Sequence, residues 1–367
     1  MGLNPEHSNA VTVAQLDAFD EVIDVRSPAE FALDHVPDAV NCPVLDDAER
    51  ARIGTLYKQV SPFDAKKLGA ALVSKNIARH IEERFRDRNS SWRPLVYCWR
   101  GGRRSAAMAH VLREIGWDAA TLEGGYRTYR REVMAQLDKL PRRFRFRVVC
   151  GTTGSGKSRL LSALAARGAQ VLDLERLACH RGSLLGELPG EPQPSQKMFD
   201  SLVWSVLKRL DPGRRVLVEA ESRKIGQLQL PTALVERMRE GECLRIEAPV
   251  AERVRFLIGE YRHFLEEPSA LKEKLTCLTD LHGRALVERW LAQTDARAWD
   301  ELVADLLVSH YDPSYLHAAT KNYLHYDEAR LVRLERLDDA AIERVAGELM
   351  RSRLIDAHLS HRGRRKP

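Results

Sequence analysis

The sequence predicts an α/β fold in two parts, in which short apolar strands alternate with helices. Two loops support this prediction. A cysteine-containing loop follows the strand-like segment 95–97, a glycine-rich loop follows the strand-like segment 144–149, and each loop leads into an apolar helical run. A basic segment with Pro141 separates the two parts, so we expect one domain over 1–138 and a second over 139–367.

Composition is typical of a globular protein of two or three domains. The 367 residues are 44% hydrophobic and 30% charged. No apolar run approaches the ~18 residues that cross a bilayer, and the first residues lack the basic and apolar regions of a signal peptide. We therefore expect a cytoplasmic protein without a membrane partner. The net charge of +6 is compatible with a nucleic-acid partner.

The cysteine content excludes two common kinds of structure. The six cysteines are scattered and form no C-x-x-C pair. This spacing argues against a structural zinc site and against a disulfide framework.

The first part begins with a β-branched strand at 22–25, which Ser27-Pro28 ends. The charged segment 46–88 is helical in pattern, with a break at Ser61-Pro62. After the strand at 95–97, a helix is predicted through Ile115 and is closed by Gly116.

Cys98 lies at the end of its strand, ahead of two glycines and a helix N-terminus. The loop amides, the helix dipole and three arginines (Arg100, Arg103 and Arg104) all favour the thiolate, which is the nucleophilic form of cysteine. A core cysteine needs none of these neighbours. We therefore predict a catalytic Cys98, with the three arginines binding an anion beside it.

The first part resembles the rhodanese family over roughly residues 10–135. The resemblance rests on Ile23-Asp24-Val25-Arg26, the segment 35–43, the Cys98 loop and the segment 122–126. It implies that Cys98 carries sulfur or selenium and that Asp24 and Arg26 brace the loop. The helical segment 46–88 interrupts the rhodanese pattern. Cys98 to Arg104 also fits C-x5-R-S, the loop of cysteine phosphatases of related fold.

The second part opens on a phosphate-binding loop. Gly151, Gly156, Lys157 and Ser158 fill every fixed position of G-x-x-x-x-G-K-[ST]. Loop N–H groups and the helix N-terminus would bind phosphate oxygens, Lys157 would neutralise them, and Ser158 would reach a Mg²⁺ ion. The predicted binding residues of this loop are Gly151, Thr152, Thr153, Gly154, Ser155, Gly156, Lys157 and Ser158.

Further strands are predicted at 169–174, 216–222 and 243–248, separated by helices, which is typical of a parallel sheet. The remainder from about 250 is predicted to be mostly helical. Ligands of open α/β sheets bind at the carboxyl ends of strands, where Asp173, Arg181, Glu219 and Arg223 are expected. Glu219 and Glu221 end an apolar strand where a nucleoside triphosphatase usually places an Asp for Mg²⁺. We find no N-K-x-D motif, which argues against a GTPase.

The pairing of these two parts resembles one family, the bacterial tRNA 2-selenouridine synthases, over nearly the whole chain. Its most specific motifs are the segments 97–102, 151–158, 180–183 and 218–226. The resemblance implies a rhodanese-like domain followed by a P-loop NTPase-like domain with a helical C-terminal part. It also implies replacement of sulfur by selenium in wobble 2-thiouridine of tRNA, with selenophosphate as donor and an S-geranyl intermediate made from geranyl diphosphate.

On this hypothesis the phosphate loop holds geranyl diphosphate with Mg²⁺, and the Cys98 loop holds selenophosphate or a perselenide. The arginines of 142–147 and the C-terminal helices are candidates for tRNA contacts, and an enzyme that supplies selenophosphate is a candidate partner. Three alternatives remain open: an ATP-dependent tRNA thiolase or kinase, a cysteine phosphatase, and a sulfur or selenium carrier without enzymatic activity.

Overall fold

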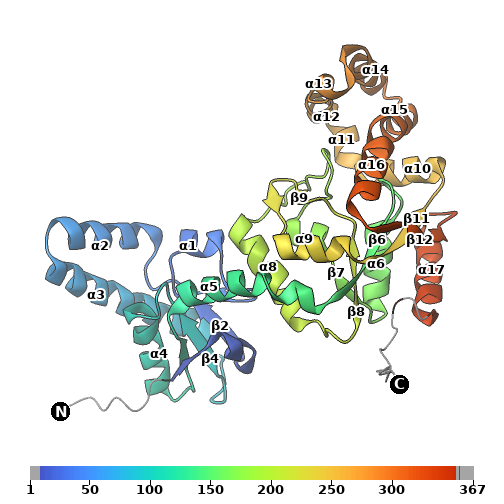
Figure 1. Cartoon of the computed structure of the whole chain (residues 1–367). Helices are drawn as coiled ribbons and strands as arrows, with labels where there is room; N and C mark the ends of the chain where they lie inside the picture. The colour runs from blue at the N-terminus through green and yellow to red at the C-terminus, as the bar shows by residue number, and fades with distance from the viewer. Residues whose placement is uncertain (1–8, 353–354, 356–367) are drawn as a thin grey trace, which may run out of the picture. The chain divides into compact units, whose positions relative to one another are not determined.

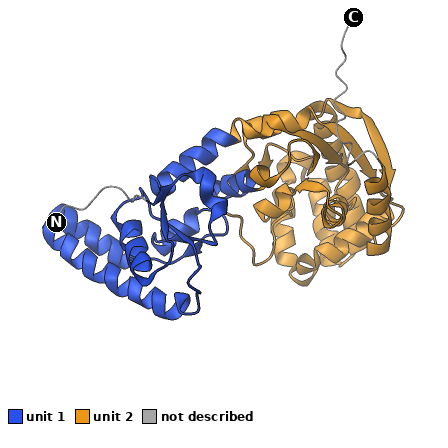
Figure 2. Cartoon of the chain, turned by 90° about the horizontal axis from the view of Figure 1, so that it is seen from below, with its two compact units in different colours: residues 1–136, 195–205 blue, residues 137–194, 206–367 orange. Residues whose placement is uncertain are grey.

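The computed structural model describes residues 9–352 and residue 355, and the chain divides into two compact units (Figure 2). Unit 1 contains residues 1–136 together with residues 195–205, and unit 2 contains residues 137–194 and 206–367. Each unit is built on its own five-stranded sheet, so the predicted α/β class is confirmed (Figure 1).

The sheet of unit 1 is parallel throughout, with strand order β1-β5-β4-β2-β3. Its strands are β1 (Ala10–Val11), β2 (Glu21–Asp24), β3 (Val40–Asn41), β4 (Pro94–Tyr97) and β5 (Ala120–Leu122). Its helices are α1 (Pro28–Leu33), α2 (Asp47–Gln59), α3 (Pro62–His80), α4 (Arg103–Ile115) and α5 (Gly125–Leu137).

Local signals account for the helices of unit 1. Asp46 caps α2 by accepting a hydrogen bond from the Glu49 N–H at 2.7 Å. Ser61 caps α3 in the same way, and Pro62 occupies its first turn. Gly116 ends α4 in the left-handed conformation, with φ +111°. The predicted helical break at residues 61–62 and the predicted helix end at Gly116 are confirmed.

The first half of helix α8 (Gln196–Arg209) belongs to unit 1. The hydroxyl of Ser201 donates to the buried Asp34 carboxylate at 2.8 Å, and the Trp204 indole donates to Gln136 at 2.7 Å. Asp34 also accepts from the Tyr126 hydroxyl at 2.6 Å. The segment thus supplies hydrogen bonds that satisfy polar groups inside unit 1.

The sheet of unit 2 is also parallel, with strand order β12-β11-β6-β8-β7. Its strands are β6 (Arg145–Cys150), β7 (Gln170–Leu172), β8 (Arg215–Glu219), β11 (Glu242–Glu247) and β12 (His325–Arg333). A small antiparallel hairpin, β9 (Lys224–Ile225) with β10 (Leu228–Gln229), follows β8. The parallel sheet was predicted, whereas β12 was not.

Helices α6 (Lys157–Ala166) and α17 (Asp339–Arg351) share an apolar core with this sheet, formed by side chains such as Leu161, Leu244 and Val345. A second core lies within the helical region after β11, around the fully buried Trp290. The helices of unit 2 not yet named are α7 (Leu174–Ala178), α9 (Thr232–Arg239), α10 (Val250–Glu260), α11 (Arg262–Glu266), α12 (Pro268–Thr276), α13 (Thr279–His282), α14 (Arg284–Asp295), α15 (Trp299–Leu306) and α16 (Asp312–Asn322).

Over the described residues, no helix combines the length and apolar character needed to pass through a bilayer.

Candidate functional site

The thiol of Cys98 lies at the carboxyl end of β4, in the loop before α4. Its Sγ accepts hydrogen bonds from the Gly102 N–H and the Ser105 hydroxyl, both at 3.2 Å. Burial raises the pKa of this thiol. The two hydrogen bonds lower it, as do the backbone N–H groups of Ser105 and Arg100. Their combined effect is the larger, so the pKa of Cys98 lies below its ordinary value. The loop therefore favours a thiolate.

A glycine turn between β5 and α5 packs directly against the Cys98 loop. The Tyr126 N–H donates to the Cys98 carbonyl at 2.9 Å. Gly125 has φ +59°, and a Cβ placed there would lie 2.2 Å from the Cys98 carbonyl oxygen and 2.4 Å from the Gly101 nitrogen. Only glycine permits this approach.

Gly125→Ala should therefore destabilise unit 1 by more than 2 kcal/mol, because about 1–2 kcal/mol of left-handed strain adds to a backbone collision. Gly116→Ala is the matched control: its φ is also positive, and a Cβ placed there would have no described atom within 4 Å beyond its chain neighbours and its own helix. Urea unfolding followed by tryptophan fluorescence compares the two variants. Equal losses of stability would show that the contact with the Cys98 loop contributes nothing.

The residues expected to brace the Cys98 loop form a buried pair. Arg26 Nη2 lies 2.6 Å from Asp24 Oδ2, and the Arg26 guanidinium stacks 3.9 Å from the Tyr126 ring centroid. Tyr126 in turn packs against Trp99, with ring centroids 5.2 Å apart. This series of contacts fits a bracing role for the pair.

The three arginines predicted beside Cys98 differ in their surroundings. Arg100 and Arg103 are exposed. Arg104 is half-buried and forms an ion pair with Glu30 at 3.3 Å. Arg100 and Arg103 are therefore the more accessible to an incoming anion, and the anion-binding role of all three stays a prediction.

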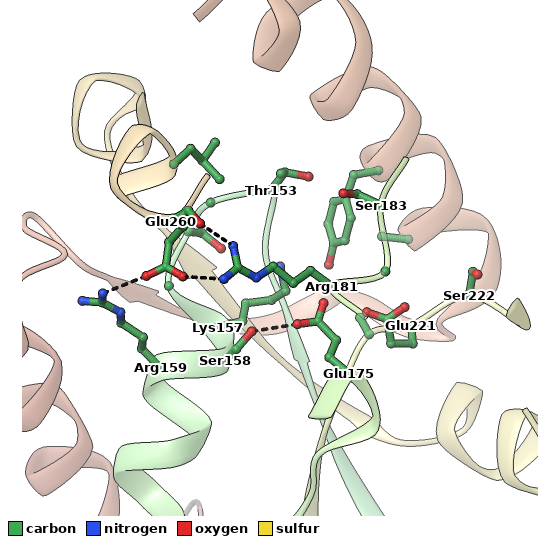
Figure 3. Close-up of a pocket in the computed structure, with 18 of the residues that line it drawn as sticks. Thr153, Lys157, Ser158, Arg159, Glu175, Arg181, Ser183, Glu221, Ser222 and Glu260 are labelled. Carbon is green, nitrogen blue, oxygen red and sulfur yellow. Dashed lines mark hydrogen bonds and ion pairs between the residues drawn. The ribbon is translucent and has the colours of Figure 1, made fainter. Parts of the chain in front are cut away.

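The phosphate loop connects β6 to α6 and borders a pocket of about 310 Å³ in unit 2 (Figure 3). The Lys157 ammonium donates to the Gly151 carbonyl at 2.7 Å and lies 5.6 Å from the Tyr315 ring centroid. The Tyr315 hydroxyl accepts from the Gly151 N–H at 2.7 Å. Lys157 is thus held at the loop, where a bound phosphate would replace the carbonyls as its partner.

Arg253 of helix α10 supports the loop without lining the pocket itself. The buried Arg253 donates from Nε to the Thr153 carbonyl at 2.9 Å and makes a two-pronged ion pair with Asp312, at 2.6 and 2.9 Å. A bidentate pair of this kind fixes geometry as well as charge. It therefore anchors the phosphate loop to α10 and α16.

Three carboxylates form a cluster at this pocket, of which Glu175 and Glu221 line it and Glu219 is buried behind them. One oxygen from each of Glu175, Glu219 and Glu221 lies within 4.8 Å of the others. The Ser158 hydroxyl donates to Glu175 at 3.1 Å, as Figure 3 shows. Glu219 is fully buried, and neither of its carboxylate oxygens has a hydrogen-bond partner among the described residues. A buried carboxylate without a partner, within a cluster of three, fits a cation site, and oxygen ligands beside a phosphate site suit Mg²⁺.

The pKa values of the three carboxyl groups agree with this interpretation. Burial, and next the charge of a neighbouring carboxylate, raises the pKa of Glu175 to about 7, that of Glu219 to about 8 and that of Glu221 to about 7. The cluster therefore holds protons at neutral pH, and a divalent cation would displace them.

The affinity for Mg²⁺ should rise at least tenfold from about pH 6 to about pH 8.5, as these groups lose protons. The same groups make the stability of the cation-free protein depend on pH. Between the ordinary pKa near 4.5 and the raised pKa values of about 7 to 8, the folded state binds more protons than the unfolded chain. The free energy of unfolding therefore falls as pH rises through 7 to 8. Thermal melts with and without Mg²⁺ at both pH values test this. An equal rise in Tm at both, or the same rise in Glu219→Gln, would contradict it.

Most of the predicted phosphate-loop residues border the same pocket. Gly151 and Thr152 do not line it and contribute loop carbonyls near Lys157 instead. The predicted residues that line the pocket together are Thr153, Gly154, Ser155, Gly156, Lys157, Ser158, Arg181 and Glu221.

Two other predicted binding residues, Asp173 and Arg223, lie outside the phosphate-loop pocket. Asp173 caps α7 by accepting from the Arg176 N–H at 2.9 Å, and Arg223 is exposed; neither lines the pocket. Arg181 lines it, but its guanidinium pairs with Glu260 at 3.1 Å. Glu219 lies in the carboxylate cluster and does not line the pocket.

Several pocket residues were not predicted. Glu175 follows β7 closely, and its carboxylate reaches the cluster because α7 begins at the carboxyl end of that strand. Tyr261, Tyr315 and Tyr323 come from the helical region, at least 100 residues beyond the phosphate loop. A glutamate near a strand end is a signal that could have been used; the tyrosines have none.

The basic segment 142–147 is exposed only in part. Arg142, Arg143 and Arg145 are exposed, whereas Arg147 is buried and pairs with Glu242. The intervening aromatic residues at 144 and 146 are buried and cannot stack on bases. The basic residues near the C-terminus, 361–366, lie outside the described residues.

Family models match both parts of the chain. The model described as a rhodanese-like domain matches residues 9–132, and that of the tRNA 2-selenouridine synthase AAA domain matches residues 144–274.

Curated relatives give the same result. The chain is 36% identical to the tRNA 2-selenouridine synthase of Nitrosomonas europaea, over 70% of this chain and 68% of that protein. It is 32% identical to the synthase of Shewanella halifaxensis, over 82% of this chain and 89% of that protein. It is 35% identical to the synthase of Shewanella sediminis, over 82% of this chain and 88% of that protein.

Proposed function

Because the chain belongs to the tRNA 2-selenouridine synthase family, we propose that it replaces sulfur by selenium in wobble 2-thiouridine of tRNA, through an S-geranyl intermediate. Geranyl diphosphate and selenophosphate are its co-substrates. The observation that carries the first half of this proposal is a pocket of unit 2 that is lined by the phosphate loop and by two members, Glu175 and Glu221, of the cluster of three carboxylates. Such a pocket suits a diphosphate bound with a cation.

In the first reaction the thione sulfur attacks the allylic C1 of geranyl diphosphate. A C–S bond forms, the C–O bond breaks, and diphosphate leaves with the bonding electron pair. Loop N–H groups and Lys157 stabilise the charge that accumulates on the leaving group. Ser158, Glu175, Glu219 and Glu221 would hold Mg²⁺, which when bound supplies further neutralisation of the diphosphate.

In the second reaction selenium attacks C2 of the alkylated base, and geranyl thiol departs. The sulfur now leaves as a thiolate bearing one alkyl group, which is a better leaving group than sulfide. Selenium is delivered when the P–Se bond of selenophosphate breaks and water takes the phosphoryl group. The exposed Arg100 and Arg103 hold the anionic donor beside Cys98, whose pKa is lowered, and the selenide released from the donor attacks C2 directly.

The experiment is nucleoside mass spectrometry of 2-thiouridine tRNA incubated with the protein, geranyl diphosphate and Mg²⁺, followed by selenophosphate. We expect geranylated thiouridine first and 2-selenouridine second. No modified nucleoside at either stage would refute the proposal. A stable Cys98 adduct alone would then indicate a carrier, and turnover of an aryl phosphate that Cys98→Ser abolishes would indicate a phosphatase.

A further inference from the structure

A second, apolar pocket adjoins the phosphate-loop pocket in unit 2. The two pockets share four lining residues: Thr153, Ser183, Leu257 and Tyr261. Beyond them the apolar pocket is walled mainly by aliphatic and aromatic side chains of α10, α11, α12 and α15. A ligand bound at the phosphate loop therefore has a hydrocarbon surface next to it.

The two pockets meet directly at the loop. Gly154 packs so closely against Leu257 that a Cβ on this glycine would lie 2.8 Å from the leucine side chain. Arg181 lies at the same junction, with its guanidinium 4.8 Å from the Tyr261 ring centroid, and Figure 3 shows it beside Glu260 and Ser183. Charged groups thus border the entrance to a pocket lined by hydrocarbon.

Few of the residues that line the apolar pocket carry polar groups, among them Thr153, Ser183, Tyr261 and Tyr311. Burial raises the pKa of both phenols above its ordinary value, so they stay neutral. The remaining wall offers few donors or acceptors. A nucleobase placed there would leave its ring nitrogens without partners, whereas a hydrocarbon chain would lose nothing.

Four residues form the inner wall of the apolar pocket: Phe264, Leu271, Leu302 and Leu306. They line this pocket but not the polar one, and they also belong to the buried core of the helical region. Leu302 is the most buried of them, with 1% exposed. Side chains in such a core yield little, so the inner wall limits the length of a chain that enters from the loop.

We propose, resting on the function proposed above, that the apolar pocket takes the prenyl chain of the diphosphate substrate and that Leu302 on its inner wall limits the chain length accepted. Each buried CH₂ raises affinity by about fourfold. A C10 chain should therefore bind far more tightly than a C5 chain or inorganic diphosphate. A C15 chain should gain nothing over C10, because its last isoprene unit meets the inner wall.

Calorimetric titration of the full chain with inorganic diphosphate and with C5, C10 and C15 prenyl diphosphates, all with Mg²⁺, tests this without tRNA. Leu302→Ala should lower C10 affinity several-fold, raise C15 affinity relative to C10 by at least tenfold, and leave inorganic diphosphate unchanged. Leu302→Met, which conserves volume, should keep the wild-type order. Leu275→Ala is the matched control, since Leu275 is equally buried in the same core but does not line the pocket.

The outcomes separate this proposal from the function on which it rests. One contrary result is a wild-type affinity that is the same for all prenyl chain lengths; another is a Leu275→Ala variant that shifts the ratio of C15 to C10 affinity as much as Leu302→Ala does. Either result would show that the apolar pocket does not hold the prenyl chain, while the diphosphate site at the phosphate loop stands. If Leu302→Ala does not fold, the wild-type and Leu302→Met series still decide. If inorganic diphosphate does not bind to the wild-type protein, or binds as tightly to Lys157→Ala, the assignment of the phosphate loop itself fails.

Discussion

Lys157→Ala should lower the rate of geranyl transfer to 2-thiouridine by about 10²- to 10³-fold, the usual effect of removing one group that stabilises transition-state charge. The Lys157 ammonium lies at the phosphate loop, 2.7 Å from the Gly151 carbonyl, and borders the pocket that also contains Ser158 and Glu175. The charge on a leaving diphosphate grows as the C–O bond breaks, so the loss should fall mainly on kcat. Quantitative mass spectrometry of S-geranylated nucleoside measures it.

The control for Lys157→Ala is Lys58→Ala, which removes an exposed lysine of α2 in unit 1 that does not line the pocket. It should leave the rate within about twofold, as expected for a surface substitution. Selenium transfer to tRNA that already carries the geranyl group should be unchanged in Lys157→Ala. A normal geranylation rate in Lys157→Ala would show that the phosphate loop does not hold the leaving group.

Cys98→Ser should reduce the formation of 2-selenouridine by about 10²-fold or more while geranylation continues, because a hydroxyl cannot replace the thiolate in handling selenium. The variant keeps the size of the side chain, so Ser105 and Gly102 retain an acceptor. The expected product is geranylated tRNA that accumulates when selenophosphate is present. Nucleoside mass spectrometry resolves the thiolated, geranylated and selenated forms in one experiment.

The control for Cys98→Ser is Cys277→Ser, since Cys277 is exposed and lies in neither candidate site. It should retain both reactions. Selenation that proceeds normally in Cys98→Ser would contradict a role for this cysteine and leave the loop as an anion-binding element alone. Loss of both reactions in Cys98→Ser, with an unchanged Tm, would contradict their assignment to separate groups.

Much of the fold could be predicted because it depends on local signals. Gly116 ends α4 and Ser61 begins α3 through interactions within a few residues. Strand β12 was missed because it lies at the edge of its sheet and exposes charged residues such as Asp327 and Glu328, so it lacks an apolar pattern. The attachment of α8 to unit 1 depends on the bond of Ser201 to Asp34, across 167 residues, and has no local signature.

The distinction between local signals and contacts over long sequence distances also explains which parts of the candidate site were predicted. The phosphate loop is one continuous motif, and its backbone conformation follows from glycines such as Gly154 and Gly156, both with positive φ. Glu175 joins Glu219 and Glu221 only when β7 and β8 pair. The tyrosines of the pocket and the apolar wall come from helices whose packing no short motif specifies.

The central claim is that the phosphate loop holds a prenyl diphosphate rather than a nucleotide. The most direct test is a reaction that contains 2-thiouridine tRNA, geranyl diphosphate and Mg²⁺ but no nucleotide. The amount of inorganic diphosphate released is compared with the amount of S-geranylated nucleoside formed. If the phosphate loop holds a prenyl diphosphate, one diphosphate is released for each geranylated nucleoside. Product that forms only when ATP is added, with ADP or AMP released in step with it, would contradict the claim and favour an ATP-dependent tRNA thiolase or kinase.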